Sequence, residues 1–374
     1  MKISVLIPNL ATNHIVRVWP VLKALERQHE VEVIGSLMGN EEIFFPYASE
    51  CSYKVVRWRK PGHIISGLKR VQTTIGGDLV YAFQPLTASF GAALLSKVRR
   101  RLPVILDITD WEVWGMYRYG GGLKHALHVA RHIAGPGWFH PNSLKYRYIA
   151  DKLIPLADAT TVVATFLQKR YGGVLLRHGP DTTVFDPVLY DRRALRDKWG
   201  LGQDVPLVAF AGTPSKWKGV DDLLAALDLV SVPKLRLLMA GKSFPHAAEK
   251  VLHLGYQPHS VMPELLAMAD LVVLPQKLHP MAEAQIPAKV FEAMAMARPV
   301  VATAVGDLPE VLGDGCGVVV EAENVPRLAE AIEEVLTNKQ RAEEMGWRAR
   351  DKCVREYSWD AIARVLETVL RPFC

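Results

Sequence analysis

Apolar and polar positions form alternating blocks along the chain. In the first half, short runs rich in β-branched residues predict buried strands at 3–7, 31–34, 79–82, 104–108 and 160–163. Between them, apolar residues at helical spacing predict helices at 18–27, 86–98 and 144–156. This alternation is typical of a parallel sheet with helices on both faces.

The second half repeats the pattern. Strands are predicted at 207–211, 235–240, 271–274, 300–303 and 317–320, and helices at 220–229, 263–268, 288–297, 325–336 and 339–355. A turn-rich stretch that contains Gly179, Pro180 and Pro187 separates the halves. We therefore expect an α/β protein of two tandem Rossmann-like, doubly wound domains, with a boundary near residue 190. Ligands in such folds bind at the carboxyl ends of the strands, so two facing sheets would share a cleft.

Size and composition agree with two cores. The chain has 374 residues and 49% hydrophobic content. No apolar run reaches 18 residues, and Pro8 interrupts the apolar start, so we expect a buried first strand and neither a membrane span nor a signal peptide. The four cysteines form no C-x-x-C pair, which indicates reduced thiols, a cytoplasmic protein and no zinc site.

Positive charge is concentrated in the first half. Residues 1–187 carry 23 Lys and Arg against 14 Asp and Glu, whereas residues 188–374 carry 22 against 25. Ten of the cations lie in 54–101, and residues 111–148 combine cations with aromatic side chains. Such a surface could attract an anionic membrane or substrate, or simply be a solvated face. Because no nucleic-acid motif is recognisable, we expect no nucleic-acid partner.

The segment 285–310 has the features of an anion site. Pro287 suits the first turn of a helix, so the free amides of Ala288 and Lys289 would face a diphosphate, to which Lys289 adds charge. The carboxylate of Glu292 could accept hydrogen bonds from two adjacent ribose hydroxyls. Gly306 lies in the loop after the next strand, where the sugar could rest. The alternative is an ordinary surface pair of Lys289 and Glu292.

A second candidate phosphate loop follows the strand at 207–211. It contains Gly212 and Thr213 and continues to Lys216, Lys218 and a helix. A strand, a glycine-containing loop and a helix with lysines suit a phosphate group. We predict this role for Lys218, whereas Lys216 could equally belong to a solvated turn.

These residues resemble a known family. Residues 287–303 read P-A-K-V-F-E-A-M-A-M-A-R-P-V-V-A-T, which resembles the donor-binding segment P-S-K-x-x-E-x-M-A-x-G-x-P-V-V-A-T of retaining glycosyltransferase family 4, in its P-x-K-x-x-E variety. Lys218 and Gly219 are similar to the K-G of the family's phosphate loop, with Thr213 at the place of its arginine. Gly241 and Tyr256 are similar to the backbone wall beside the nucleobase.

The resemblance implies the GT-B fold, in which a final helix crosses back to the first domain. It therefore assigns residues 1–190 plus 357–374 to an acceptor-side domain and residues 191–356 to a nucleotide-sugar-binding domain. The sequence departs from the family at three places. Ala284, with Glu283 beside it, stands where many members have a first Glu. Thr109 stands where many have a sugar-facing His, and Ala297 replaces the glycine that ends the helix.

The activity implied by the resemblance is retaining transfer of a hexosyl group from a nucleotide-diphosphate sugar to a hydroxyl acceptor, such as a lipid-linked or cell-surface glycan precursor. The implied enzyme uses no metal or other cofactor and works in the cytoplasm, with an anionic membrane surface as a candidate partner. Lys218 and Glu292 would act on the donor. Asp110 could steer the acceptor or cap the next helix. Candidate acceptor contacts are Asn13, His14, Arg17 and Trp111.

Three alternatives stay open. The first is a sugar-nucleotide epimerase or a glycoside phosphorylase on the same fold, and the second is a catalytically silent nucleotide-binding relative. The third is a dinucleotide oxidoreductase, which the absence of a G-x-G-x-x-G turn after either first strand disfavours.

Overall fold

The computed structural model describes residues 1–48, 51–58, 63–114, 122–135, 140–212, 215–241 and 250–374. The chain forms two compact units: the N-terminal unit, Met1–Arg177 with Ile362–Cys374, and the C-terminal unit, His178–Ala361. The first break thus lies at the start of the turn-rich stretch, earlier than the expected boundary at 190. The second lies inside the last helix, after the expected boundary at 357. Each unit contains one parallel sheet with helices, which confirms the predicted fold class.

The sheet of the N-terminal unit has seven parallel strands in the order β3-β2-β1-β4-β5-β6-β7. In chain order they are β1 (Lys2–Ile7), β2 (Glu30–Met38), β3 (Tyr53–Trp58), β4 (Leu79–Phe83), β5 (Val104–Ile108), β6 (Ala159–Val162) and β7 (Val174–Leu175). In the register, Val5 of β1 lies opposite Val33 on one side and Tyr81 on the other. All three side chains are buried, as expected for a central strand covered on both faces.

The main helices of this unit are α1 (His14–Leu25), α2 (Ile64–Thr74), α3 (Ala92–Arg100), α5 (Gly122–Ala134), α6 (Leu144–Leu153) and α7 (Thr165–Tyr171). The last helix, α16 (Trp359–Leu370), starts in the C-terminal unit, and its residues from Ile362 onward belong to the N-terminal unit. There Gln28 donates a hydrogen bond to Glu367 at 2.5 Å. The final helix therefore crosses back to the first unit, as predicted.

The sheet of the C-terminal unit has six parallel strands in the order β10-β9-β8-β11-β12-β13. They are β8 (Leu207–Ala211), β9 (Arg236–Ala240), β10 (Val251–His253), β11 (Leu271–Leu274), β12 (Val300–Thr303) and β13 (Val318–Val320). The helices are α8 (Arg192–Lys198), α9 (Val220–Leu229), α10 (Met262–Met268), α11 (Pro280–Glu283), α12 (Ala288–Ala295), α13 (Leu308–Val311), α14 (Val325–Thr337) and α15 (Lys339–Glu356).

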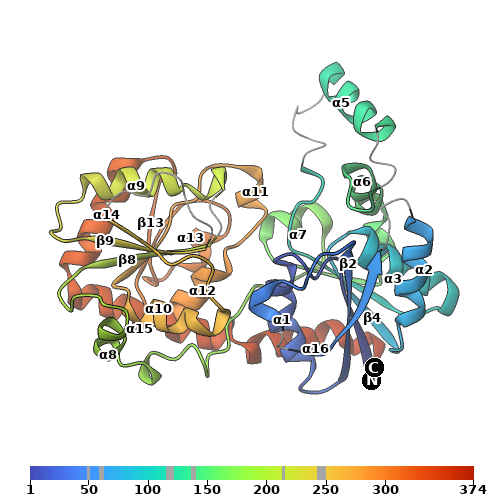
Figure 1. Cartoon of the computed structure of the whole chain (residues 1–374), viewed down its shortest axis with the longest axis horizontal. Coiled ribbons are helices and arrows are strands. Elements are labelled where there is room, and N and C mark those ends of the chain that lie inside the picture. Colours follow the sequence, from blue (N-terminus) through green and yellow to red (C-terminus); the bar gives the residue numbers. More distant parts are fainter. Residues whose placement is uncertain (49–50, 59–62, 115–121, 136–139, 213–214, 242–249) are drawn as a thin grey trace. The chain divides into compact units, whose positions relative to one another are not determined.

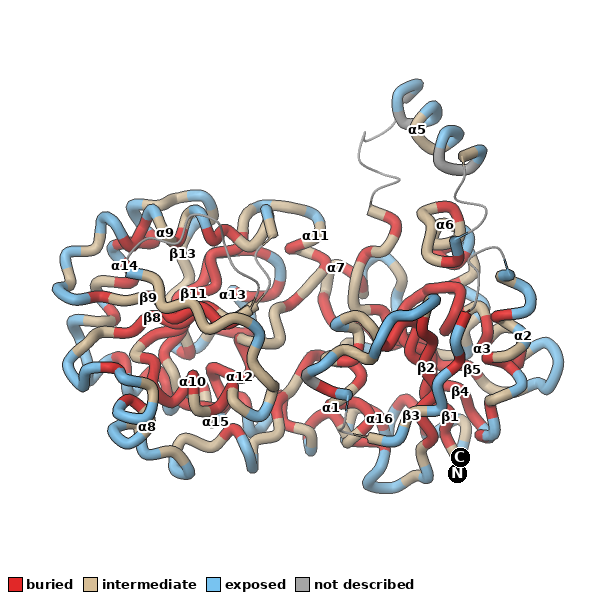
Figure 2. The backbone as a smooth tube through the Cα atoms, viewed as in Figure 1, coloured by how far each residue is buried: buried red, intermediate tan, exposed pale blue. Residues whose placement is uncertain are grey.

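Helices cover both faces of this sheet. In Figure 1, α9 and α14 lie on one face, and α10, α12 and α15 lie on the other. Leu223 of α9 and Ile332 of α14 pack with Val208 and Leu237 of the strands, and all four are buried. Figure 2 shows the same pattern along the backbone, with the buried residues gathered in the strands. Each such buried aliphatic side chain stabilises the fold by about 1.5–3 kcal/mol.

The sequence analysis missed elements that lack a continuous apolar run. Strand β3 is the edge of its sheet, so its residues alternate, and Lys54, Val55 and Arg57 are exposed. Strands β7 and β10 have two and three residues, too few to produce a pattern.

Each sheet reverses its strand order once. The reversal lies between β1 and β4 in the N-terminal unit and between β8 and β11 in the C-terminal unit. In open parallel sheets, ligands bind at the carboxyl ends of the strands beside such a reversal. The loops that follow these strands are therefore where a site is expected in each unit.

Candidate functional site

In the C-terminal unit, helix α12 lies in the chain between β11 and β12. Pro287 caps the helix with φ −63° and ψ 121°, and the helix begins at Ala288. The amides of Ala288 and Lys289 are among the first four of the helix, which have no carbonyl partner within it. The helix start and the charge of Lys289 thus favour an anion.

Glu292 lies buried on the same helix. Lys289 Nζ donates hydrogen bonds to both of its carboxylate oxygens, at 3.1 and 2.9 Å, and His259 Nε2 lies 3.3 Å from Oε1. Burial by itself raises the pKa of Glu292, but the charge of Lys289 and the contact with His259 outweigh it and lower the pKa to about 2. Because its carboxylate is 5% exposed, this pair is not an ordinary surface pair.

The sequence analysis missed His259. This residue begins a 3-10 turn (His259–Val261), and its ring lies 5.5 Å from that of buried Phe185. Its neighbours in the chain carry no chemical signal, and its partner Glu292 lies 33 residues away.

The loop after β8 brings one lysine to the carboxyl end of that strand. Lys218 is half-buried, and its Nζ lies 3.4 Å from the position that a Cβ on Gly212 would take. Lys216, in the same 3-10 turn, is exposed. Lys218 therefore lies over the end of β8, as a phosphate ligand would require. Thr213 lies outside the described residues.

Glycines allow the loops at the strand-order reversal of this sheet, between β8 and β11, to approach one another closely. Gly219 has φ +62°, and a Cβ there would lie 1.8 Å from Pro275 O, in the loop after β11. Gly241 has φ +137°, and its amide donates to Gly255 O at 2.8 Å. The next residue, Tyr256, is 55% exposed. Backbone and one aromatic ring thus line the ends of β8, β9 and β10.

Gly306 lies in the turn after β12. Its φ is +56°, and a Cβ there would lie 3.3 Å from the carbonyl oxygens of both Ala282 and Glu283. The turn therefore packs beside the backbone of α11. Ala284, at the place of the family's first Glu, is completely buried.

In the N-terminal unit, Arg17, which the sequence suggested as an acceptor contact, is almost completely buried. Its guanidinium is 3% exposed and forms two hydrogen bonds with the buried carboxylate of Asp107, at 3.0 and 2.8 Å. It also donates to the carbonyls of Leu176 and Arg177. Arg17 thus ties β5 to the end of the unit, and these contacts occupy its guanidinium.

Two further acceptor candidates differ in exposure. Trp111 is 8% exposed, packs 5.4 Å from the ring of Phe166, and has the guanidinium of Arg170 at 4.6 Å over its face. Asn13 is exposed and precedes α1 without a side-chain capping bond. Trp111 thus supports the loop after β5, whereas Asn13 faces solvent.

Asp110 is held by a residue that the sequence analysis did not select. Gln84, at the end of β4, donates from Nε2 to Asp110 Oδ2 at 2.9 Å, and its Oε1 accepts from the amide of Thr109 at 3.2 Å. Gln84 is 2% exposed and has φ +64°, a conformation that L-residues rarely adopt. Such strain is typical of functional sites.

His14 and Glu112 lie beside Asp110. One ligand atom from each of the three residues lies within 4.8 Å of the others. His14 Nε2 is 3.8 Å from Glu112 Oε1, and Arg147 lies 2.8 Å from Glu112 Oε2. Neither Glu112 nor Arg147 was predicted from the sequence.

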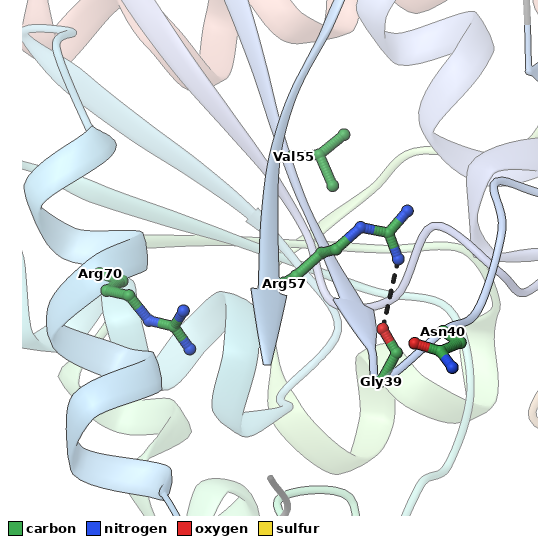
Figure 3. A pocket seen from close by; sticks show the side chains of 5 residues that line it. All are labelled: Gly39, Asn40, Val55, Arg57 and Arg70. Carbon is green, nitrogen blue, oxygen red and sulfur yellow. Dashed lines mark hydrogen bonds between the residues drawn. The ribbon is translucent and has the colours of Figure 1, made fainter. Parts of the chain in front are cut away.

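A basic cavity lies at the edge of the same sheet (Figure 3). It measures about 480 Å³ and is lined by Gly39, Asn40, Val55, Arg57 and Arg70. Arg57 donates to the carbonyls of Gly39 and Glu41. Figure 3 shows Arg70 extending from α2 toward β3. Among the described residues, no helix has the length and hydropathy needed to span a bilayer.

Comparisons with known proteins agree with this geometry. Residues 191–352 match the family "Glycosyl transferases group 1". Alpha-maltose-1-phosphate synthase of Mycolicibacterium smegmatis is 33% identical over 50% of this chain and 54% of its own length. A GDP-mannose-dependent phosphatidylinositol monomannoside mannosyltransferase of Corynebacterium glutamicum is 26% identical over 57% of this chain and 62% of its own length. The chain thus spans somewhat more than half of these relatives.

Solved structures match over the whole chain. Sucrose-phosphate synthase of Thermosynechococcus elongatus has a TM-score of 0.73 at 18% identity, with 100% of this chain and 98% of that chain covered. HepE of Anabaena, in complex with UDP-glucose, has a TM-score of 0.75 at 18% identity, with coverage of 99% and 100%. The chain thus contains a group 1 glycosyl transferase domain at residues 191–352, and its two units have the GT-B fold.

Proposed function

We propose that this protein is a retaining glycosyltransferase that moves a hexosyl group from a nucleotide-diphosphate sugar to a hydroxyl acceptor. The observation that carries the proposal is the buried cluster at the start of α12, where Glu292 is held ionised by Lys289 and His259. An ionised carboxylate beside free helix amides suits a ligand that offers both hydroxyl donors and an anion. A nucleoside diphosphate offers both.

In this proposal the diphosphate binds to the amides of Ala288 and Lys289 and to Lys218. Glu292 accepts hydrogen bonds from the two ribose hydroxyls, and Gly241 and Tyr256 lie beside the base. The sugar rests against Gly306. As the glycosidic bond breaks, negative charge grows on the leaving diphosphate, and the preorganised amides and cations stabilise it. The same cations neutralise the diphosphate, so the reaction needs no metal ion or further cofactor.

The relatives support a hexosyl donor. Two are GDP-mannose-dependent mannosyltransferases, one from Corynebacterium glutamicum and one from Mycobacterium tuberculosis. HepE binds UDP-glucose in its crystal structure. These proteins use different bases, so we propose the class of donor without a base. The N-terminal unit would bind the acceptor hydroxyl, with Asp110, Asn13 and His14 as its candidate contacts.

We further propose that the N-terminal unit contacts an anionic membrane surface from the cytoplasm, where a lipid-linked glycan precursor would be the acceptor. Helix α5 exposes Leu123 by 76% and Leu127 by 61%, beside the cations Lys124 and Arg131. Exposed leucines with neighbouring cations are typical of interfacial helices. The cavity with Arg57 and Arg70 would receive a phosphate headgroup. The four cysteines all lie among the described residues and form no disulfide bond, in keeping with a reducing compartment.

A thermal-shift panel of UDP, GDP and ADP, each with its glucose or mannose derivative, tests the donor site. A nucleotide at 100 times its dissociation constant should stabilise the protein by about 2.7 kcal/mol. The variant Glu292→Ala should lose that stabilisation, whereas Glu283→Ala should keep it. No shift with any nucleotide would contradict the donor site.

Co-sedimentation with vesicles tests the membrane contact separately. We expect binding to vesicles that contain phosphatidylserine at low salt, and weaker binding for the double variant Leu123→Ser/Leu127→Ser. Equal binding to neutral and anionic vesicles, or none at low salt, would remove this part of the proposal.

A further inference from the structure

Hydrogen-bond acceptors from two loops converge at the reversal of the N-terminal sheet. His14 follows β1, whereas Asp110 and Glu112 follow β5, and β4 lies between these strands. One ring nitrogen of His14 and one oxygen of each carboxylate lie within 4.8 Å of one another. This is the position where an open parallel sheet binds its ligand.

The proton on the His14 ring can be assigned from its neighbours. Thr12 has one hydroxyl proton, and it donates this proton to the carbonyl of Asn9 at 3.0 Å. The 2.8 Å contact between Thr12 Oγ1 and His14 Nδ1 then requires the ring proton on Nδ1. In the neutral ring, Nε2 therefore carries a lone pair. This lone pair lies on the side of Glu112, whose Oε1 is 3.8 Å away, too far for a direct hydrogen bond.

Both carboxylates are anchored by donors. Arg147 holds Glu112 through Oε2, and Gln84 holds Asp110 through Oδ2. The side chain of Glu112 is 8% exposed, so its orientation is set by these contacts. With Oε2 held by Arg147, Glu112 Oε1 faces His14 Nε2. In the assigned tautomer, both of these atoms accept hydrogen bonds.

A ligand that binds between His14 and Glu112 must supply hydrogen-bond donors or a positive charge. A divalent cation is one such ligand, but Arg147 already places a positive charge 2.8 Å from Glu112, and this charge opposes a second cation there. Two adjacent hydroxyls of a sugar fit better, because each has one proton to donate. We propose that His14 and Glu112, with Asp110 beside them, bind a vicinal diol of a sugar.

This diol site extends the proposed function. It depends on the proposed function only in one respect, namely that the bound sugar is a substrate. His14 then supplies an imidazole to the site from the start of α1. Many family members instead have a His at the position that Thr109 occupies here. Gln84 acts as a positioning residue through Asp110. The diol could come from the donor sugar or from the acceptor, and the experiment separates these two sources.

The first measurement is nitrogen-15 NMR of the full chain labelled at histidine. The spectrum of His14→Gln identifies the His14 signals, and exposed His63→Gln serves as the matched control. We expect neutral His14 to carry its proton on Nδ1, the tautomer that is less common in free histidine. Sugar binding should move the Nε2 signal. A shift with UDP-glucose or GDP-mannose but not with UDP or GDP assigns the diol to the donor. A shift with methyl α-glucoside or methyl α-mannoside assigns it to the acceptor.

Calorimetry with His14→Ala provides the second measurement. We expect affinity for the shifting sugar ligand to fall at least tenfold, while affinity for UDP or GDP stays within twofold and the melting temperature is retained. A proton on Nε2, no sugar-dependent shift, or stoichiometric broadening by Mn²⁺ alone would overturn the diol site. Failure of the proposed donor site is distinct, because it would abolish nucleotide binding in the unchanged protein and leave the tautomer and free-sugar results in place.

Discussion

The carboxyl edges of the two sheets share the same reversal of strand order but differ in the side chains that their loops present. In the C-terminal unit, this edge presents donors and cations: the first amides of α12, Lys289 and Lys218. In the N-terminal unit, it brings together a ring nitrogen of His14 and the carboxylates of Asp110 and Glu112, which we propose as acceptors. A donor-rich edge suits phosphate oxygens, whereas an acceptor-rich edge suits sugar hydroxyls. Two copies of one fold can thus divide the recognition of a sugar nucleotide and a hydroxyl compound between them.

Buried charge also differs between the two edges. Under the acceptor-rich edge, Arg17 and Asp107 form a closed pair that supports the fold. At the donor-rich edge, Lys289 and Glu292 form a pair in which Lys289 is 22% exposed, and we propose that a bound ligand replaces some of its contacts. Loss of the Arg17–Asp107 pair should therefore lower the free energy of unfolding. The Lys289–Glu292 pair should instead change its contacts when a ligand binds.

The largest expected effect is on the structural pair. Arg17→Met leaves the carboxylate of Asp107 buried without its cation, which should lower the free energy of unfolding by about 3–5 kcal/mol. Urea denaturation measures the change. The matched control is Lys23→Met on the same helix, which removes a surface pair with Glu26 and should cost at most about 1 kcal/mol. Equal losses for both variants would contradict the distinction.

The next effect is on the donor-rich edge. Lys218→Met should weaken binding of UDP or GDP about tenfold to a hundredfold, because a charged hydrogen bond to phosphate contributes about 1.5–3 kcal/mol. Isothermal titration calorimetry gives the dissociation constants. The control Lys216→Met, in the same turn but exposed, should change affinity less than twofold. If the two variants are equally affected, the selection of Lys218 fails.

Acid should protonate Glu292 and so weaken its ion pair with Lys289. The pKa of Glu292 is lowered from about 4.5 to about 2 in the folded protein, so its contribution to stability is complete above pH 4.5 and is lost as the pH falls toward 2. Between pH 6 and pH 3.5 the loss should be on the order of 1 kcal/mol. Denaturation of the unchanged protein and of Glu292→Gln at both pH values tests this. An unchanged pH slope in the variant would show that Glu292 does not carry the effect.

The smallest effect concerns the end of α12. Ala297 has φ +51°, which costs about 1–2 kcal/mol for a residue with a Cβ and nothing for glycine. Ala297→Gly should raise the free energy of unfolding by about 0.5 kcal/mol, since loss of the buried methyl offsets part of the gain. The control Ala295→Gly, at a helical position, should be destabilising. A destabilised Ala297→Gly would mean that packing outweighs the backbone strain.

The sequence predicted the two halves of the molecule unequally. Strands such as β8 and β12 are continuous apolar runs, and the donor segment is continuous from Pro287 to Gly306, so both were recognised from local pattern. The acceptor-rich edge is assembled from His14, Gln84, Glu112 and Arg147, which come from four separate segments with no local motif. Arg17 is a further example. Its partner Asp107 lies 90 residues away in the sequence, and no local pattern around Arg17 indicates that the two are paired.

Co-crystallisation of the chain with UDP or GDP, whichever stabilises it more, tests the central claim most directly. The account predicts the diphosphate on the amides of Ala288 and Lys289 and on Lys218, with the ribose hydroxyls bonded to Glu292. A nucleotide bound elsewhere, or bound here without contact to Glu292, would contradict it.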